Sequence, residues 1–137
     1  MACAPDSGVL FGWFNSGVRD SKTGTGEFIG VQLEGPTRVG HYFQPAVMNA
    51  SGKRRLAQKG PLLTPGKSFA FQIDYDPAAG EHGVIHAALD GDSIDFPLKA
   101  EDRQPGRGFD RFGLRTIFVG GNQVKVYIDD LSYSAGQ

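Results

Sequence analysis

Apolar and polar residues alternate along several short stretches of this chain, a period of two that is typical of β-strands with one buried face. From Phe69 to Tyr75, for example, every second residue is aromatic or isoleucine, and the residues between them are small or polar. The pattern predicts strands over residues 9–16, 27–34, 38–44, 67–75, 83–89 and 93–98, with two closing strands within 109–133. No stretch has a convincing helical period, so the chain is predicted to be all-β.

Turn residues separate the predicted strands. Asp90-Gly91 predicts a tight hairpin, because both residues tolerate the positive φ of a two-residue turn. Gly120-Gly121-Asn122 gives the same expectation for the two closing strands. Strands that follow one another through hairpins pair antiparallel, which favours an antiparallel two-sheet sandwich of the jelly-roll type.

The pattern is least clear after the third predicted strand. Pro45 is expected to stop or bend that strand, since proline donates no hydrogen bond to a neighbour. Residues 46–49 are expected to pair briefly, and residues 53–55 to begin a polar edge or loop that carries Leu56.

Composition narrows the class of protein. A chain of 137 residues is the size of one domain, so residues 1–137 are predicted to form a single sandwich with residues 1–7 as a flexible terminus. The net charge of −1 gives no field that would attract nucleic acid, and no apolar run is long enough for membrane insertion. The first residues lack the pattern of a signal peptide, and Cys3, the single cysteine, excludes an internal disulfide.

Four runs of sequence resemble one known family. These runs are 11–15 (FGWFN), 28–43 (FIGVQLEGPTRVGHYF), 109–114 (FDRFGL) and 126–133 (VYIDDLSY). They resemble concanavalin A-like lectin/glucanase domains, with a LamG-like jelly roll, of secreted or surface proteins from environmental bacteria. The resemblance implies two antiparallel sheets, a concave face that holds a polysaccharide or oligosaccharide, and an extracellular or periplasmic location. It also implies that the domain is a module of a larger protein.

The catalytic pattern of that family is missing. Its glucanases carry Glu-x-Asp-x-x-Glu on one strand, so that the carboxylates point into the same cleft. No such triple occurs in this sequence, which favours a protein that is not an enzyme.

Two groups of aspartates have simpler expected roles. Asp129 and Asp130 are adjacent on a predicted strand, so their side chains point to opposite faces, and one is expected to pair with Arg111 or Arg115. Asp90 and Asp92 flank the hairpin turn. Turn formation explains them, and a structural calcium site is the alternative; no other cofactor is expected.

A sugar-binding face needs flat aromatic rings for the pyranose and planar polar groups for its hydroxyls. Strand alternation places several such groups away from the predicted core. These candidate ligand-binding residues are Trp13, Asn15, Gln32, Glu34, Arg38, Tyr42, Gln44, Lys125 and Tyr127. The competing interpretation is that Trp13 belongs to the core and that the polar groups form ordinary solvated surface.

The sequence thus predicts a non-catalytic carbohydrate-binding or accessory module. One alternative is a glycan-cleaving hydrolase or lyase that uses carboxylates from different strands, such as Glu34 with Asp129. Another is a structural sandwich that mediates protein assembly.

Overall fold

The computed structural model describes residues 7–15, 27–35, 41–49, 53–64, 66–103, 108–116 and 127–134. Over these residues the chain is all-β, with one short 3-10 helix at Ala100–Arg103. The strands are β1 (Ser7–Phe14), β2 (Phe28–Gly35), β3 (His41–Met48), β4 (Arg54–Leu56), β5 (Leu62–Leu63), β6 (Phe71–Asp76), β7 (Val84–Leu89), β8 (Asp92–Pro97) and β9 (Arg111–Thr116). No helix in the described part of the chain has the length and apolar character that crossing a membrane requires.

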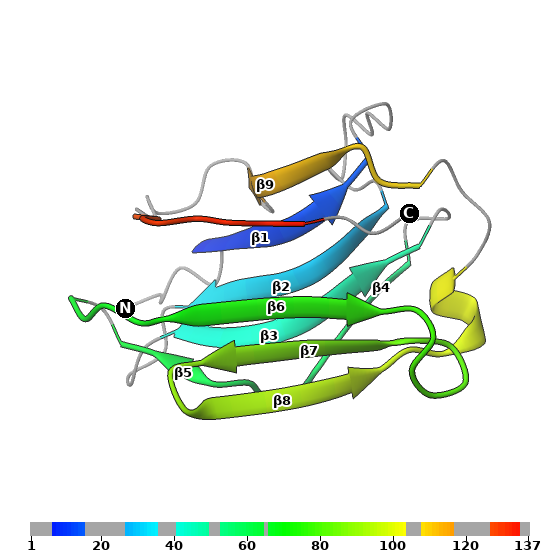
Figure 1. Ribbon diagram of the computed structural model, residues 1–137, viewed down its shortest axis with the longest axis horizontal. Helices are drawn as coiled ribbons and strands as arrows, with labels where there is room; N and C mark the ends of the chain where they lie inside the picture. Colours follow the sequence, from blue (N-terminus) through cyan, green and yellow to red (C-terminus); the bar gives the residue numbers. More distant parts are fainter. Residues whose placement is uncertain are drawn as a thin grey trace, which may run out of the picture.

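The strands form two antiparallel sheets that lie one above the other (Figure 1). The larger sheet has the order β4-β3-β2-β1-β9, and β5 also pairs with β3. The smaller sheet has the order β6-β7-β8. The expectation of an all-β chain with two antiparallel sheets is therefore confirmed.

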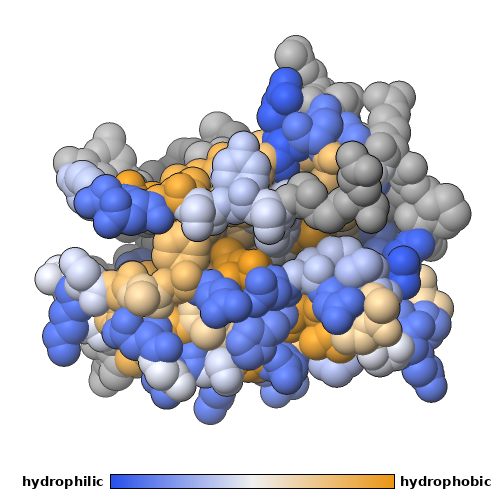
Figure 2. Space-filling view, viewed as in Figure 1, coloured by the Kyte–Doolittle hydropathy of each residue, from blue (hydrophilic) through white to orange (hydrophobic). Residues whose placement is uncertain are grey.

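The main core lies between the two sheets. Phe11, Val31 and Phe43 of the larger sheet pack against Ala87 and Leu89 of the smaller one, and all are nearly inaccessible to solvent. The space-filling view shows apolar side chains gathered between the two layers (Figure 2). Two well-separated sheets thus bury a shared apolar interior, as in a β-sandwich.

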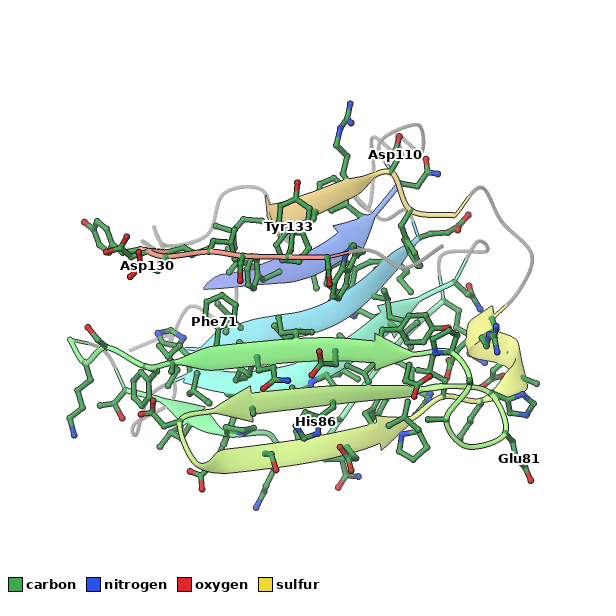
Figure 3. All side chains as sticks on the ribbon, viewed as in Figure 1. Phe71, Glu81, His86, Asp110, Asp130 and Tyr133 are labelled. Carbon is green, nitrogen blue, oxygen red and sulfur yellow. The ribbon has the colours of Figure 1, made fainter. Side chains whose placement is uncertain are left out.

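Aromatic rings connect the layers at the side of the core. Phe71 on β6 meets Phe11 edge-on with ring centroids 5.2 Å apart, and it also approaches Phe43 at 6.4 Å. Figure 3 shows Phe71 on β6 with its ring directed toward the larger sheet. The predicted alternation of β6 is confirmed, because Phe71, Ile73 and Tyr75 are half-buried while the residues between them are exposed.

The opposite face of the larger sheet is also apolar and buried. Leu10, Phe28, Ala46 and Met48 form a second cluster there, each at most 3% exposed. They alternate along their strands with residues of the main core, so β1, β2 and β3 have apolar side chains on both faces.

The hairpin between β7 and β8 forms as predicted. Asp90 adopts a φ of 54°, the left-handed conformation that such a turn requires. Its backbone N–H donates to the carbonyl of Ala70 (2.7 Å), and its carboxylate accepts a hydrogen bond from the Ala70 N–H (2.9 Å). Asp90 therefore also fixes the residue that leads into β6.

The expectation that Pro45 ends its strand is wrong, because β3 continues through it to Met48. The Pro45 carbonyl accepts a hydrogen bond from the Ala57 N–H (2.9 Å), but proline has no N–H to return to the Ala57 carbonyl. The side chain of Gln44 supplies that donor, with its Nε2 3.0 Å from the Ala57 oxygen and 3.1 Å from the Gln58 oxygen. The neighbouring side chain thus replaces the missing backbone hydrogen bond.

Replacing Gln44 by leucine is therefore expected to destabilise the fold. The substitution removes the buried Gln44 amide and leaves two backbone carbonyls without their donor, which costs about 1 to 3 kcal/mol of unfolding free energy. Urea unfolding followed by circular dichroism measures the change. As a control, Gln72→Leu removes an exposed amide whose hydrogen bond goes only to Asp74, and it should change the free energy by less than about 0.5 kcal/mol. Equal losses in the two variants would contradict this role for Gln44.

The closing hairpin is only partly as predicted. β9 forms within the first expected strand, but residues 127–134 contain no strand. Asp130 has a φ of 50°, and its N–H donates to the Asp129 carboxylate (2.9 Å), so this backbone does not run extended into a ladder. The Gly-Gly-Asn turn lies outside the described residues. Ser7 belongs to β1 and not to a flexible terminus, while residues 1–6 also lie outside the described part.

The ion pair expected for the closing aspartates does not form with Arg111. Within the described residues, neither Asp129 nor Asp130 makes a salt bridge, and Arg111 donates to the carbonyl of Asp110 (3.3 Å). The side chain of Arg115, the other expected partner, is outside the described part of the structure.

Candidate functional site

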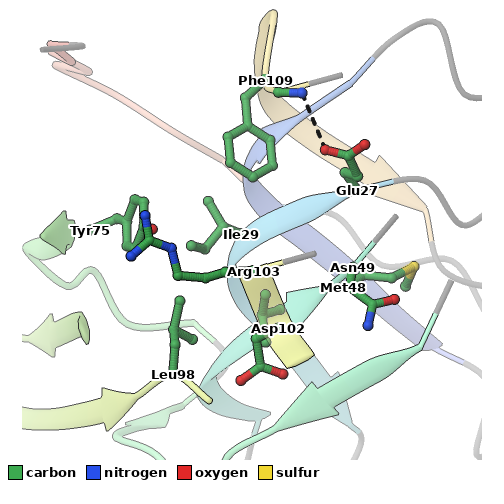
Figure 4. Close-up of a pocket in the computed structure, with 11 residues that line it drawn as sticks. Glu27, Ile29, Met48, Asn49, Tyr75, Leu98, Asp102, Arg103 and Phe109 are labelled. Carbon is green, nitrogen blue, oxygen red and sulfur yellow. Dashed lines mark hydrogen bonds between the residues drawn. The ribbon is translucent and has the colours of Figure 1, made fainter. Parts of the chain in front are cut away.

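A pocket of about 200 Å³ opens at one end of the sandwich (Figure 4). It lies where β2 begins and where β3 and β6 end, and the 3-10 helix contributes Asp102 and Arg103 to its lining. Its lining residues are Glu27, Ile29, Val47, Met48, Asn49, Tyr75, Leu98, Asp102, Arg103, Gly108 and Phe109.

The pocket combines an apolar floor with two aromatic rings. Ile29, Val47 and Leu98 belong to the buried core and close the inner end. Tyr75 is half-buried, and Phe109 is unusually open for its size, with 43% of its surface exposed. A ring that remains this accessible beside a pocket offers a flat apolar surface to a ligand.

Hydrogen bonds hold the backbone next to Phe109 in place. Asn15, directly after β1, donates from its side chain to the Gly108 carbonyl (2.7 Å). The Gly108 N–H in turn donates to the carboxylate of Glu27 (3.3 Å), and the Asp110 N–H donates to the Phe14 carbonyl (3.1 Å). Asn15 and Glu27 are both less than 10% exposed, so these buried groups fix the backbone that carries Phe109.

The opposite wall is tied to β3. Asn49 donates from its amide to the Glu101 carbonyl in the 3-10 helix (2.9 Å), and its amide oxygen accepts from the Lys53 N–H (3.0 Å). The end of β3 therefore holds the short helix that carries Asp102 and Arg103.

Asp102 is ionised and already paired. Burial alone would raise the pKa of its carboxyl group, but hydrogen bonds from Arg55 and from the Lys99 N–H, together with their positive charges, hold the pKa below its usual value. The Arg55 guanidinium also donates to the Pro97 carbonyl and lies 4.2 Å from the centre of the Phe96 ring. This carboxylate joins β4 to the 3-10 helix and is poorly suited to donate a proton to a substrate.

Among the described residues that line the pocket, Arg103 is the cation. Its side chain is exposed, and one long hydrogen bond joins it to the Pro77 carbonyl (3.4 Å). A guanidinium has five N–H donors, so the others remain open to a ligand. Figure 4 shows Arg103 at the pocket together with Tyr75 and Phe109.

Part of the predicted sugar-binding set comes together on the outer face of the larger sheet. Gln32 lies opposite Gln44, and Glu34 lies opposite Tyr42 across β2 and β3. Gln32 is 2% exposed and accepts a hydrogen bond from Arg54 (3.2 Å), while Gln44 is 4% exposed and bonded as described above. Tyr42 is half-buried, and the side chain of Glu34 is outside the described part of the structure.

The other predicted residues lie elsewhere. Trp13 is on the inner face of β1, where it packs against the core with its ring 5.1 Å from that of Phe112, as the competing interpretation predicts. Asn15 is at the pocket, and Tyr127 is 88% exposed on the 127–134 segment. Arg38 and Lys125 are outside the described residues. Among the described candidates, the structure therefore forms no single face.

The predicted metal and catalytic aspartates are also separate from the pocket. Asp90 and Asp92 stand at the tip of the β7–β8 hairpin, and the carboxylate of Asp90 is bonded to the Ala70 N–H. Among the described residues, no three His, Cys, Asp or Glu side chains are arranged to hold a metal ion. Asp129 is exposed on the 127–134 segment.

Sequence reasoning did not identify the pocket, because its polar and aromatic residues come from segments far apart in the chain. The strand pattern predicts Tyr75 as a core-facing residue, Arg103 lies between two predicted strands, and Phe109 begins the predicted closing strands. These residues are too far apart in the sequence to form a recognisable short motif. Comparison of the chain with protein-family models, with curated proteins and with solved structures gives no match.

Proposed function

We propose that this protein is a non-catalytic carbohydrate-binding or accessory module and that the pocket at the end of the sandwich receives the sugar. The observation that carries the proposal is the combination of Phe109, Tyr75 and Arg103 around one small cavity. Exposed rings beside open hydrogen-bond donors are the groups that a pyranose needs.

Each part of the pocket has a role in this proposal. The Phe109 ring covers the C–H face of a sugar ring, and the Arg103 guanidinium donates to its hydroxyl oxygens. A cavity of about 200 Å³ is smaller than a typical drug-sized pocket, which favours one sugar unit over a long chain segment. The expected ligand is therefore an end or a side branch of a polysaccharide.

The state of the carboxylates supports binding without cleavage. Glycosidases need one carboxylic acid whose pKa is raised so that it can protonate the leaving oxygen. The pKa of Asp102 is shifted in the opposite direction, and its carboxylate is paired with Arg55. Glu27, the other carboxylate among the described lining residues, is engaged in holding the backbone, because it accepts a hydrogen bond from the Gly108 N–H.

The proposal includes a finer fold and a setting. We propose a concanavalin A-like jelly roll, supported by the sequence resemblance of four runs and by the return of β9 to the side of β1. The same resemblance supports a secreted or surface location, within a larger protein that acts on or adheres to polysaccharide.

Replacing Phe109 by alanine is expected to weaken polysaccharide binding about tenfold, equivalent to about 1.4 kcal/mol, because the ring platform is removed. Arg103→Gln should weaken it to a similar extent through loss of the charged donor. Affinity gel electrophoresis against a polysaccharide panel, after a glycan array, measures both changes. Tyr127→Ala is the matched control, since it removes an exposed aromatic side chain that does not line the pocket. Retention of no polysaccharide, or equal binding by Phe109→Ala and the unaltered protein, would overturn the proposal.

A further inference from the structure

The smaller sheet has an unpaired edge. In the described part of the chain β6 pairs with β7 and with no other strand. The Asp90 N–H donates to the Ala70 carbonyl, and residues 70 and 90 continue the β6–β7 register. Because hydrogen-bonding directions alternate along a strand, the backbone groups of Phe71, Ile73 and Tyr75 point to the free edge.

An apolar groove runs along this edge. The space-filling view shows a hollow band between β6 and the 127–134 segment (Figure 2). Phe71 and Ile73 on one side, and Ile128 on the other, pack against the same core cluster while remaining partly accessible. Tyr133 stacks on Phe112 of β9 with ring centroids 5.0 Å apart, and it lies over that strand in Figure 3 with 67% of its surface exposed.

Acidic side chains border the groove on both sides. Asp74 and Asp76 are exposed on the outer face of β6, where they alternate with the apolar residues. Asp129 and Asp130 are exposed on the 127–134 segment. The border therefore attracts a basic partner, while the interior accepts apolar side chains.

We propose that β6 receives an extended segment of a partner protein as an added strand, and that this segment alternates apolar with basic residues. The added strand pairs with the free N–H and C=O groups of Phe71, Ile73 and Tyr75. Its apolar side chains enter the groove, and its lysine or arginine side chains lie across from Asp74 and Asp76 on the outer face. This inference does not depend on the sugar pocket, so either proposal can fail without the other.

A synthetic peptide of alternating valine and lysine tests the inference. Its affinity for the intact protein is measured by fluorescence anisotropy at low and physiological salt. The double variant Asp74→Lys/Asp76→Lys should weaken binding at least about tenfold, because it reverses the charge beside the edge. The matched control, Asp92→Lys/Asp95→Lys, makes the same charge change on β8 at the far edge of the sheet and should leave binding within about threefold.

A second peptide isolates the backbone contribution. Methylation of alternate peptide nitrogens removes the N–H groups that face β6 and should abolish binding, while charge and apolar side chains are unchanged. Three results would overturn the inference: no binding of the unmodified peptide, equal weakening by the two double variants, or equal binding of the methylated peptide. A concentration-dependent mass in sedimentation without peptide binding would assign the edge to a second copy of the chain and would also overturn it.

Discussion

Replacing Gly30 by alanine is expected to destabilise the protein by about 2 to 6 kcal/mol, a large part of the stability of an ordinary domain. Gly30 lies directly opposite Gly12 across β1 and β2. A Cβ atom at Gly30 would stand 2.3 Å from the Phe11 carbonyl oxygen and 2.8 Å from the Gly12 Cα, so backbone atoms would have to move. The φ of 157° at Gly30 also lies where other residues are strained.

Urea unfolding followed by circular dichroism and by the fluorescence of Trp13, the single tryptophan, measures this loss. Gly91→Ala is the control, because a Cβ atom at Gly91 would meet no atom within 4 Å. We expect it to change the unfolding free energy by less than about 1 kcal/mol. If the Gly30 variant unfolds at the same urea concentration as the unaltered protein, then β1 and β2 are not as close as described.

Replacing Asp102 by asparagine is expected to lower the unfolding free energy by about 2 to 4 kcal/mol at pH 7. The side chain of Asp102 is 5% exposed and that of Arg55 is 24% exposed, so the substitution leaves a poorly hydrated guanidinium without its counter-ion. Removing one partner of a fully buried ion pair costs more unfolding free energy than this. The partial exposure of Arg55 lets water hydrate its charge and so reduces the loss here.

The same ion pair gives the protein a defined response to acid. The pKa of Asp102 is lowered in the folded state relative to an unfolded value of about 3.9. Its stabilising contribution is therefore complete above about pH 4 and is lost as the pH falls through the lower folded-state pKa. The stability difference between the unaltered protein and Asp102→Asn should accordingly narrow below pH 4, as measured by urea unfolding at successive pH values.

The adjacent pair provides the control for this prediction. Lys53 and Glu101 also form a salt bridge at 3.1 Å, but their side chains are 64% and 45% exposed. Glu101→Gln should therefore change stability by less than about 0.5 kcal/mol at any pH. If the unfolding free energies of Asp102→Asn and of the unaltered protein instead differ by the same amount from pH 7 to pH 3, the carboxylate charge is not what stabilises the contact.

The sequence predicted the strands of the smaller sheet well, because these strands have one buried and one exposed face. Phe71, Ile73 and Tyr75 alternate with polar residues, and Asp90 marks the turn that follows β7. The faces of the strands in the larger sheet are harder to predict from sequence, since β1, β2 and β3 have apolar side chains on both faces. Alternation alone could not assign Trp13 to a face, and its place opposite Ile29 on β2 and Phe112 on β9 is what puts it on the core face.

Other features depend on contacts between distant residues. The continuation of β3 through Pro45 requires the Gln44 amide to reach the Ala57 carbonyl, which depends on where β4 lies. The pocket likewise assembles Tyr75 and Arg103 with Phe109, whose position is fixed by Asn15 from the other end of the chain. Local sequence patterns do not predict contacts between residues that are distant in the chain. The resemblance of short runs to a family does not predict these contacts either.

The pairing of β1 with β9 has a consequence for how the protein is made. Synthesis proceeds from the N-terminus, so β1 leaves the ribosome long before its neighbour β9. Until then, β1 has an open edge beside Phe11 and Trp13, and open apolar edges are the sites at which nascent chains associate with one another. The strands of the smaller sheet, in contrast, follow one another through short turns and can pair as soon as they emerge. Until β9 has been made, this edge of β1 is therefore a place where a chaperone would protect the nascent chain.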